Sequence, residues 1–237
     1  MNFNQQKDYQ MKKLLIFSGA GMSAESGLKT FRDNDGLWEN YRVEDVATPE
    51  AWQADPGLVL QFYNARRKQL LDATPNPAHF LIKKLEDKFD VTVITQNIDD
   101  LHERAGSSNI VHLHGELKKV RSEKFDHLVY DWPKAELNLG ELCKRGTQLR
   151  PHVVWFGEEV PMMTKALEIA ASAEILIVVG TSLNVYPAAN VAFSVPIECK
   201  NYLVDPNPPA LNDEINFTVV KAGAEEGILS LIKKLNA

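Results

Sequence analysis

The predicted fold depends on two segments, VTVITQNID (residues 91–99) and IVHLHGE (residues 110–116). Each begins with an apolar run that indicates a buried strand and continues into amide, carboxylate or imidazole side chains. Parallel strands bring such residues together at the carboxyl edge of an open α/β sheet, where ligands bind. Because an imidazole there can exchange a proton near neutral pH, the two segments predict a reactive site at this edge.

A purely structural role is the alternative for each of these polar residues. A single histidine at a strand end is more often structural than catalytic, and an Asn or Asp there commonly caps the next helix. Asp99 and Asp100 do precede a segment that predicts a helix ending at Gly106. The functional interpretation is favoured because three further strands end in the same kind of residue.

The first predicted strand, LLIF (residues 14–17), runs into GAGMSA (residues 19–24), a G-x-G-x-x-A turn. Its glycines allow a tight turn and a close approach of backbone N–H groups to a pyrophosphate. Ser23 can cap a following helix, whose N-terminus favours anions. Glycine turns after strands are common, so this motif alone leaves nucleotide binding and a simple turn equally open.

Two later strands also end in small or polar residues. ILIVV (residues 175–179) is followed by Gly180, Thr181 and Ser182, and YLV (residues 202–204) by Asp205, Pro206 and Asn207. A last strand is predicted at 217–220, a helix at 166–173, and amphipathic helices at 78–85 and 225–235. Because strands alternate with helices, we predict an α/β fold, a Rossmann-like doubly wound parallel sheet with a small inserted lobe.

A helix is predicted from Pro56 to about Leu71, because Asp55 is a capping residue followed by proline. Tyr63 and Arg66 lie three residues apart and share one face of it. A phenol beside a guanidinium can bind a small carboxylate. The alternative, which these residues alone favour, is a solvated helix face beside Arg67 and Lys68.

Two other segments point to substrate and cofactor contacts. RPHVVWFGE (residues 150–158) predicts a short edge strand, to which an extended peptide could add; an ordinary strand in a loop is the alternative. TFRDNDGLW (residues 30–38) predicts a loop. Since it carries an arginine and aromatic side chains, it is either a flap over a cofactor or a packed loop.

Composition limits the class of protein and its partners. The chain has 237 residues and a net charge of −6, which argues against DNA or an anionic membrane as the main partner. Its two cysteines do not indicate a disulfide framework, so we expect a reducing cytoplasm. No apolar run approaches the ~20 residues of a membrane span, and residues 14–17 are too few for a signal peptide.

Taken in order, six segments resemble the motifs of the sirtuins, the NAD-dependent protein-lysine deacylases. They are GAGMS (19–23), TFR (30–32), TQNID (95–99), HGE (114–116), VWFGE (154–158) and GTS (180–182). The resemblance covers residues 13–235, and six motifs in order are far more specific than any one of them. VEDVATP (43–49) and FYNARR (62–67) are similar to short bacterial members that remove acidic acyl groups.

The resemblance implies roles for individual residues. His114 resembles the general base, and Asn97 and Asp99, also catalytic, line a nicotinamide pocket. The remaining contacts to NAD would come from Gly19, Ala20, Gly21, Ser23, Ala24, Phe31, Arg32, Gln96, Ile98, Gly180, Thr181, Ser182, Asp205, Pro206, Asn207 and Ala224. The acylated peptide would be bound by Tyr63, Arg66, Val154, Phe156, Gly157 and Glu158.

The implied reaction uses NAD as co-substrate and gives nicotinamide, deacylated lysine and O-acyl-ADP-ribose. One catalytic domain, residues 11–237, would comprise an NAD-binding part (11–40, 75–117 and 150–237) and a small lobe (41–74 and 118–149). We expect acylated proteins or peptides as partners, neither nucleic acid nor membrane, and a monomer. ADP-ribosyl transfer, NAD hydrolysis and a non-catalytic NAD sensor are the alternatives.

The sequence departs from the family at its structural zinc site. Sirtuins usually carry two Cys-x-x-Cys pairs before the Arg-Pro-His segment, whereas this chain has only Cys143 there, and Ser122 stands where a first cysteine is expected. His127 and Cys143 supply at most two of the four ligands that such zinc needs. We therefore predict that zinc is absent. Packing would then hold the lobe through Val129, Tyr130, Trp132, Leu137, Leu139 and Leu142.

Overall fold

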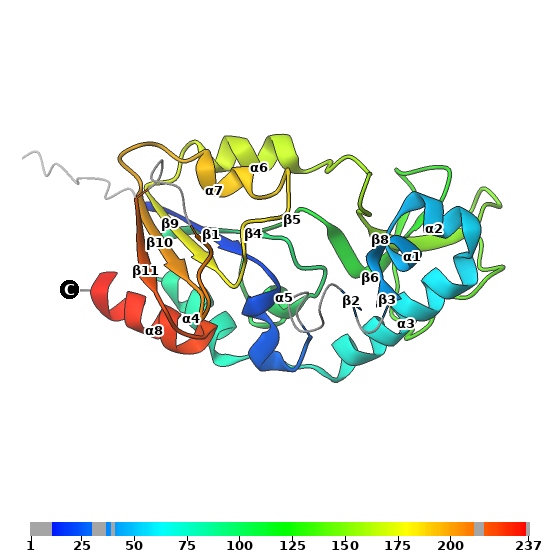
Figure 1. The fold of residues 1–237 in the computed structure, drawn as a ribbon, viewed down its shortest axis with the longest axis horizontal. Helices are drawn as coiled ribbons and strands as arrows, with labels where there is room; N and C mark the ends of the chain where they lie inside the picture. The colour runs from blue at the N-terminus through cyan, green and yellow to red at the C-terminus, as the bar shows by residue number, and fades with distance from the viewer. Residues whose placement is uncertain (1–10, 30–36, 39–40, 211–215, 236–237) are drawn as a thin grey trace, which may run out of the picture.

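The computed structural model describes residues 11–29, 37–38, 41–210 and 216–235. Within them, six parallel strands form one sheet in the order β11-β10-β9-β1-β4-β5 (Figure 1). They are β1 (Lys13–Ser18), β4 (Asp90–Thr95), β5 (Ile110–His112), β9 (Ile175–Val179), β10 (Lys200–Val204) and β11 (Phe217–Val220). Since the strand order reverses between β1 and β9, this is the doubly wound sheet that the sequence predicts.

The carboxyl ends of the strands lie in register along one edge of the sheet. Ser18 pairs with Thr95 on one side and with Val179 on the other, and Thr95 pairs in turn with His112. The residues that follow these positions therefore leave the sheet side by side, which places the glycine turn and the predicted polar segments next to one another.

Helices cover both faces of the sheet. Leu14 and Ile16 of β1 face a core with α4 (Pro77–Leu85) and α8 (Ala224–Leu235), while Leu15 and Phe17 face a core with α6 (Met163–Ala170) and α7 (Asn190–Phe193). The two helix layers lie on opposite sides of the sheet in Figure 1. Residues 14–17 are all buried for this reason, as expected for a continuous apolar strand between two helix layers.

A second, smaller group of elements lies at the other end of the molecule (Figure 1). It contains α1 (Val43–Val46), α2 (Pro49–Ala54), α3 (Pro56–Asp72) and an antiparallel sheet in the order β7-β6-β8. These strands are β7 (Val129–Asp131), β6 (Gly115–Ser122) and β8 (Leu149–Val153), and β2 (Leu37–Trp38) and β3 (Tyr41–Arg42) form a separate ribbon. The prediction that the segment after Arg150 lies at a sheet edge is confirmed, because β8 is an outer strand.

Two helix starts in this group follow the capping pattern of the sequence. The side chain of Thr48 accepts a hydrogen bond from Ala51 N at the start of α2, and Asp55 accepts one from Leu58 N at the start of α3. A proline follows each cap and needs no hydrogen bond of its own there. Helix α3, which carries Tyr63 and Arg66, therefore begins and ends close to where the sequence predicts.

The glycine turn after β1 differs from expectation, because no long helix follows it. The chain instead makes two short 3₁₀ turns, η1 (Ala20–Met22) and η2 (Ala24–Ser26). Ser23 does not cap a helix, since its hydroxyl donates to Asp99 Oδ2 at 2.9 Å. The predicted helix N-terminus is thus wrong, and this serine links β1 to the segment after β4.

The packing prediction for residues 118–149 is partly wrong. Val129, Leu139 and Leu142 are exposed. Leu137 is buried, Tyr130 and Trp132 pack partly buried, and the core also draws on residues that the prediction omitted: Leu60, Val120, Leu128, Cys143 and Leu149. A core assembled from two separate chain segments is not visible in the hydrophobic pattern of either one.

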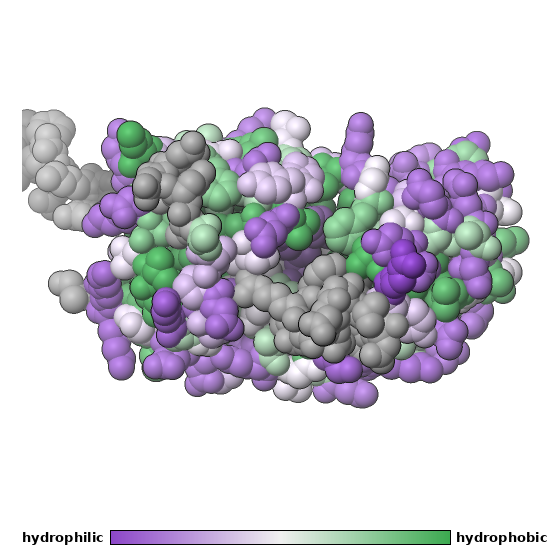
Figure 2. All heavy atoms as spheres, viewed as in Figure 1, coloured by the Kyte–Doolittle hydropathy of each residue, from purple (hydrophilic) through white to green (hydrophobic). Residues whose placement is uncertain are grey.

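The surface is mainly hydrophilic along the helices. On the face shown in Figure 2, hydrophilic side chains cover most of the lower edge, where α3, α4 and α8 lie in Figure 1. Their inner faces supply buried residues such as Ile82 and Ile228 to the core. In the part of the chain that the structure describes, no helix has both the length and the apolar character needed to cross a bilayer.

Candidate functional site

A cavity of about 500 Å³ lies along the carboxyl edge of the parallel sheet and reaches α3 and the segment after β8. Every residue predicted for the site lines it, apart from two that lie outside the described residues, Phe31 and Arg32. Segments from all parts of the chain, from Gly19 to Ala224, thus meet in one place. The structure therefore brings the predicted residues together.

Backbone contact between two turns forms the floor of the cavity. Gly180, at φ +65°, lies so close to Gly21 and Met22 that a Cβ at this position would collide with both. A Cβ on Gly21 would lie 2.7 Å from the Gly180 Cα. Because only glycine permits this approach, the turns after β1 and β9 form a side-chain-free surface of the kind that accommodates a phosphate.

A buried polar cluster joins the glycine turn to the segment after β4. The Asn97 side-chain amide donates to Gly19 O at 3.0 Å and to Ser23 Oγ at 3.1 Å, while Ser23 Oγ donates to Asp99 Oδ2. Asp99 Oδ1 accepts from Leu101 N at 3.1 Å. Burial raises the pKa of Asp99, although the hydrogen bonds from Ser23 and Leu101 oppose this shift. These contacts fix the amide and the carboxylate relative to the turn.

His114 is held by a single hydrogen bond to the backbone. Its Nδ1 lies 3.0 Å from Gln96 O, and since a carbonyl oxygen can only accept, Nδ1 carries the hydrogen. Nε2 then carries the lone pair. Burial lowers the pKa of His114, against the effect of the Gln96 hydrogen bond, so the imidazole is neutral at pH 7. A neutral imidazole lining a cavity is a competent general base.

Gln96 connects three strand ends. Its backbone N donates to Ser18 O at 2.9 Å, and its side-chain amide donates to Thr181 Oγ1 at 3.1 Å. Because its carbonyl also holds His114, the position of that imidazole depends on β1, β4 and β9 together. At the far end of the same edge, Asn207 N donates to Asp205 Oδ1 at 2.8 Å and closes the turn after β10.

The opposite end of the cavity is formed by α3 and the segment after β8. The Tyr63 hydroxyl accepts a hydrogen bond from Trp155 Nε1 at 3.1 Å, and both side chains are buried. Burial raises the pKa of Tyr63 far above its usual value, so the phenol stays protonated and can donate. Arg66, one turn further along α3, is half-buried and lines the cavity beside it.

The alternative of a solvated helix face does not describe this side of α3. Arg67 is fully buried and donates from Nε to Leu117 O at 3.0 Å and from Nη1 to Asn64 Oδ1 at 2.9 Å. Of the charged residues near Arg66, Lys68 is exposed and pairs with Glu136. The helix thus presents two inward faces, one toward the cavity and one toward β6.

Glu158 lines the cavity, but its carboxylate is committed to neighbours within the protein. It accepts from Arg150 Nη1 at 2.6 Å, from Arg121 Nη2 at 2.9 Å and from Trp155 N at 2.7 Å. Burial works to raise the pKa of Glu158, yet these hydrogen bonds and charges hold it below its usual value. Glu158 therefore fixes the turn after β8.

Several lining residues were not predicted. Leu70 and Gln69 extend the stripe of α3 that begins at Tyr63 and Arg66, so helical spacing from that pair could have revealed them. Trp155 lies inside a segment that the sequence did single out. Tyr186 and Leu28 also line the cavity, but they come from loops whose sequence carries no comparable signal.

The small lobe does not offer the donor set of a structural zinc site. Ser122 Oγ accepts from Lys124 N and Phe125 N and lies 2.7 Å from Thr147 Oγ1, which is in turn 3.2 Å from Cys143 Sγ. Cys143 is the one cysteine in this part of the sequence. Since such zinc is held by four cysteine or histidine ligands, these residues do not fit it.

Comparison with known proteins agrees with this geometry. The family model described as Sir2 family matches residues 19–187. An NAD-dependent protein deacylase of Bacteroides thetaiotaomicron is 52% identical over 226 residues, which cover 93% of this chain and 97% of the relative. Another NAD-dependent protein deacylase, from Helicobacter pylori, is 50% identical over 225 residues, covering 95% of this chain and 98% of the relative.

Solved structures give the same result. A complex of a mutant Sir2 homologue with ADP-ribose is similar with a TM-score of 0.86 at 36% identity, covering 95% of this chain and 92% of that one. A complex of a Sir2 homologue with NAD has a TM-score of 0.84 at 37% identity, covering 95% and 90%. The similarity thus includes both the sheet and the smaller group of elements.

Proposed function

The chain belongs to the Sir2 family, and from this premise we propose how its cavity divides the work of deacylation. The protein is an NAD-dependent protein deacylase, with NAD as co-substrate and acylated lysine side chains of proteins as substrates. The bond between nicotinamide and ribose in NAD breaks in this reaction, which releases nicotinamide. The ADP-ribosyl group then accepts the acyl group. The assignments below rest on one observation, that the predicted reactive and recognition residues line the same cavity.

His114 is the general base of this proposal. Its Nδ1 hydrogen is committed to Gln96 O, so Nε2 is the basic atom, and burial keeps the ring neutral. It takes a proton from a ribose hydroxyl so that this oxygen can attack the acyl carbon, and later returns the proton. The hydrogen bond to a backbone carbonyl keeps the ring in one tautomer throughout.

Asn97 and Asp99 form the nicotinamide end of the cavity. The Asn97 amide donates to Gly19 O and to Ser23 Oγ, and Ser23 Oγ donates in turn to Asp99. These hydrogen bonds leave both side chains little freedom to move. A rigid polar surface at this position orients the departing carboxamide without reorganising during the reaction. Gln96 supports the same segment from the Thr181 side.

The other NAD contacts follow the sheet edge. The turns around Gly21 and Gly180 take the pyrophosphate, Thr181 and Ser182 the phosphate and ribose, and residues 205–207 with Ala224 the adenosine. Phe31 and Arg32 belong to a cofactor loop by resemblance and lie outside the described residues. We assign residues 11–40, 75–117 and 150–237 to the NAD-binding part and residues 41–74 and 118–149 to the small lobe.

The peptide lies as an added strand against Val154, Phe156 and Gly157. Val154 N and Phe156 N are already bonded, to His114 O at 2.9 Å and Ala47 O at 3.0 Å, which fixes the segment between the two lobes. An extended peptide along it places an acyl-lysine side chain between His114 and α3. The acyl group then points toward Tyr63 and Arg66.

An acidic acyl group is the preferred substrate. Tyr63 stays protonated and can donate a hydrogen bond, and Arg66 supplies a guanidinium beside it in the cavity. A succinyl or malonyl carboxylate can bind both, whereas an acetyl group offers them no charge. A hydrogen bond to a charged group contributes roughly 1.5–3 kcal/mol, which predicts a preference of about tenfold to a hundredfold in kcat/KM.

Replacing Arg66 with methionine tests this preference. Met retains the length and apolar stem of the side chain but removes the charge, so desuccinylation should fall about tenfold to a hundredfold while deacetylation is spared. The measurement is kcat/KM for the same peptide carrying succinyl- or acetyl-lysine, at saturating NAD.

Lys68→Met is the matched control, because Lys68 lies on the same helix, outside the cavity, in an exposed pair with Glu136. It should leave the ratio of the two kcat/KM values within about twofold. Full desuccinylation by the Arg66→Met protein would show that the acidic-acyl assignment is wrong.

We also infer that the small lobe is built without zinc. The hydroxyl groups of Ser122 and Thr147 and the Cys143 thiol bond to one another, and Arg145 stacks on Phe125 with its guanidinium carbon 4.0 Å from the ring centre. These side-chain contacts and one stacked cation can hold two turns together in the place where metal ligands would do so.

A further inference from the structure

His112 and His114 are held in the same way by neighbouring carbonyl groups. His114 Nδ1 lies 3.0 Å from Gln96 O, and His112 Nδ1 lies 3.1 Å from Asn97 O. Both oxygens belong to the segment after β4, which carries Asn97 and Asp99. The proposed reaction uses His114 as the general base and gives no task to His112, although His112 contacts the same segment.

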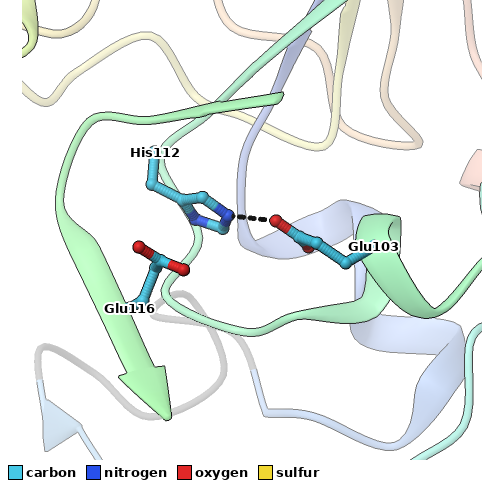
Figure 3. Close-up of side chains that lie close together, drawn as sticks. All are labelled: Glu103, His112 and Glu116. Carbon is cyan, nitrogen blue, oxygen red and sulfur yellow. Dashed lines mark hydrogen bonds and ion pairs between the residues drawn. The ribbon is translucent and has the colours of Figure 1, made fainter. Parts of the chain in front are cut away.

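The two imidazoles differ at Nε2. His112 Nε2 lies 2.6 Å from Glu103 Oε1, on α5 (Leu101–Arg104), as the dashed line in Figure 3 marks. The Asn97 carbonyl can only accept a hydrogen bond, and so can an ionised carboxylate. The Glu103 side chain is 39% exposed and meets Nε2 here as a carboxylate acceptor. Both ring nitrogens of His112 must therefore carry a hydrogen, which makes the ring an imidazolium.

The surrounding charges favour this state. Glu116 of β6 lies on the other side of the ring in Figure 3, where Lys119 binds it at 2.8 Å, and the buried Asp99 also faces His112. His102 is the nearby imidazole, and burial keeps it neutral. Burial works to lower the pKa of His112, but Glu103, the Asn97 carbonyl and Glu116 raise it above the usual value.

A metal ion is the competing interpretation of these side chains. The ligand atoms of Glu103, His112 and Glu116 lie within 4.8 Å of one another, the one such group that the described residues contain. The positions for a cation are filled, however, by the Nε2 hydrogen between His112 and Glu103 and by the Lys119 ammonium on Glu116. The contacts thus favour a bound proton over a metal.

We propose that His112 is a positioning residue, whose imidazolium joins Glu103 to the Asn97 carbonyl and so fixes the nicotinamide end of the cavity from behind. The inference rests on the proposed function, in which Asn97 and Asp99 receive nicotinamide. A charged donor holds the carbonyl more tightly than a neutral one. Its positive charge also favours the ionised form of Asp99.

The protonation of His112 can be measured without any turnover. The chain has six histidines, so ¹⁵N chemical shifts of their rings can be followed from pH 5 to 9, with His112→Gln identifying the signal. We expect His112 to be an imidazolium at pH 7, with a pKa above ~6.5. In Glu103→Gln the pKa of His112 should fall, because the neutral amide no longer favours the charged ring.

The positioning role is tested by steady-state kinetics. His112→Gln should raise KM for NAD and the inhibition constant of nicotinamide about tenfold each, because the variant loses one charge-assisted hydrogen bond. The KM for acyl-peptide should stay within about twofold. In Glu103→Gln the amide can donate to a neutral Nε2 while Nδ1 still donates to Asn97 O, so this variant should retain most of the NAD affinity.

Glu116→Gln is the matched control for the kinetics, since Glu116 faces His112 without a hydrogen bond to it and lies outside the cavity, so KM for NAD and the nicotinamide constant should stay within about twofold. A pKa of His112 at or below ~6.5 would overturn the proposal, as would displacement of its proton by added Zn²⁺ at equimolar concentration. Unchanged NAD and nicotinamide constants in His112→Gln would also overturn it. Absence of acyl-dependent nicotinamide release by the unaltered protein would instead contradict the proposed function, and the ring titration distinguishes the two failures.

Discussion

The sheet end and the small-lobe end of the cavity are held in place by different kinds of contact. At the sheet end, backbone groups of several strand ends hold the reactive side chains: Gln96 O holds His114, and Gly19 O holds Asn97. At the small-lobe end, Tyr63 is held by a side-chain hydrogen bond from Trp155. Arg66 lies on the same helix as Tyr63, α3. Under the proposed function, sheet topology fixes the residues assigned to chemistry, whereas a few replaceable side chains are assigned to recognition of the acyl group.

The largest expected effect comes from removing the base at the sheet end. His114→Ala should lower the rate of deacylation by roughly a hundredfold to ten-thousandfold, the usual contribution of a positioned general base. The measurement is kcat with saturating NAD and succinyl-peptide. His127→Ala is the control, since His127 is exposed in the small lobe, and it should retain the full rate.

The second prediction concerns how the free energy of unfolding changes at low pH because of two buried histidines near the sheet end. His79 and His102 are buried with ring centres 4.9 Å apart. Burial lowers the pKa of His79 to about 4, whereas the unfolded residue titrates near ~6.5. Between these two pH values the unfolded state therefore binds more protons than the folded state. The contribution of the neutral His79 to the free energy of unfolding is complete above pH ~6.5 and is lost as the pH drops toward 4.

For His79 alone the loss corresponds to about 3 kcal/mol. Urea unfolding of wild type and His79→Gln at several pH values from 7 to 4 should show a shallower decline in the variant by about this amount. His127→Gln should decline as steeply as wild type. Parallel curves for wild type and His79→Gln would mean that the buried ring does not resist protonation.

The third prediction applies to the small lobe. Ser122 is buried, and its hydroxyl accepts from Lys124 N and Phe125 N. Ser122→Ala leaves these groups without their acceptor and should lower the free energy of unfolding by about 1–2 kcal/mol. Because the proposed function assigns recognition to the lobe and the base to His114, deacetylation at low temperature should be nearly unchanged. Equal loss of kcat and stability would contradict the division between the two ends.

The smallest expected effect is that of a chelator. If the contacts among Ser122, Thr147 and Cys143 hold the lobe, dialysis against EDTA should leave both Tm and kcat unchanged. Metal analysis of the purified protein should give far less than one zinc per chain. Stoichiometric zinc, or a Tm that falls on dialysis and recovers with added zinc, would contradict the zinc-free lobe.

The sheet end could be predicted from sequence, because each of its strands is a short apolar run followed directly by the polar residues concerned. Parallel pairing then determines that segments such as 96–99 and 180–182 meet. The small-lobe end was harder, because its contacts join distant segments. The hydrogen bond from Trp155 to Tyr63 spans 92 residues of sequence, and Arg67, which looks solvent-exposed, is buried against Leu117.

The same limit applies to two other residues. Ser23 follows a glycine turn as helix caps often do, and only the arrival of Asp99 from another strand gives its hydroxyl a different partner. Glu158 stays a predicted substrate contact, and its motif does not reveal that Arg150 and Arg121 also bind its carboxylate. Local patterns indicate which residues are polar and near an edge, but the partner of each is decided by tertiary contacts.

The most direct test of the account is to follow nicotinamide release and peptide mass together. The protein is incubated with NAD and one peptide bearing succinyl-lysine, acetyl-lysine or unmodified lysine. The account predicts release that depends on the acyl group, equals the loss of acyl mass, and is fastest with the succinyl peptide. Equal release with the unmodified peptide, or transfer of ADP-ribose to it, would contradict the account.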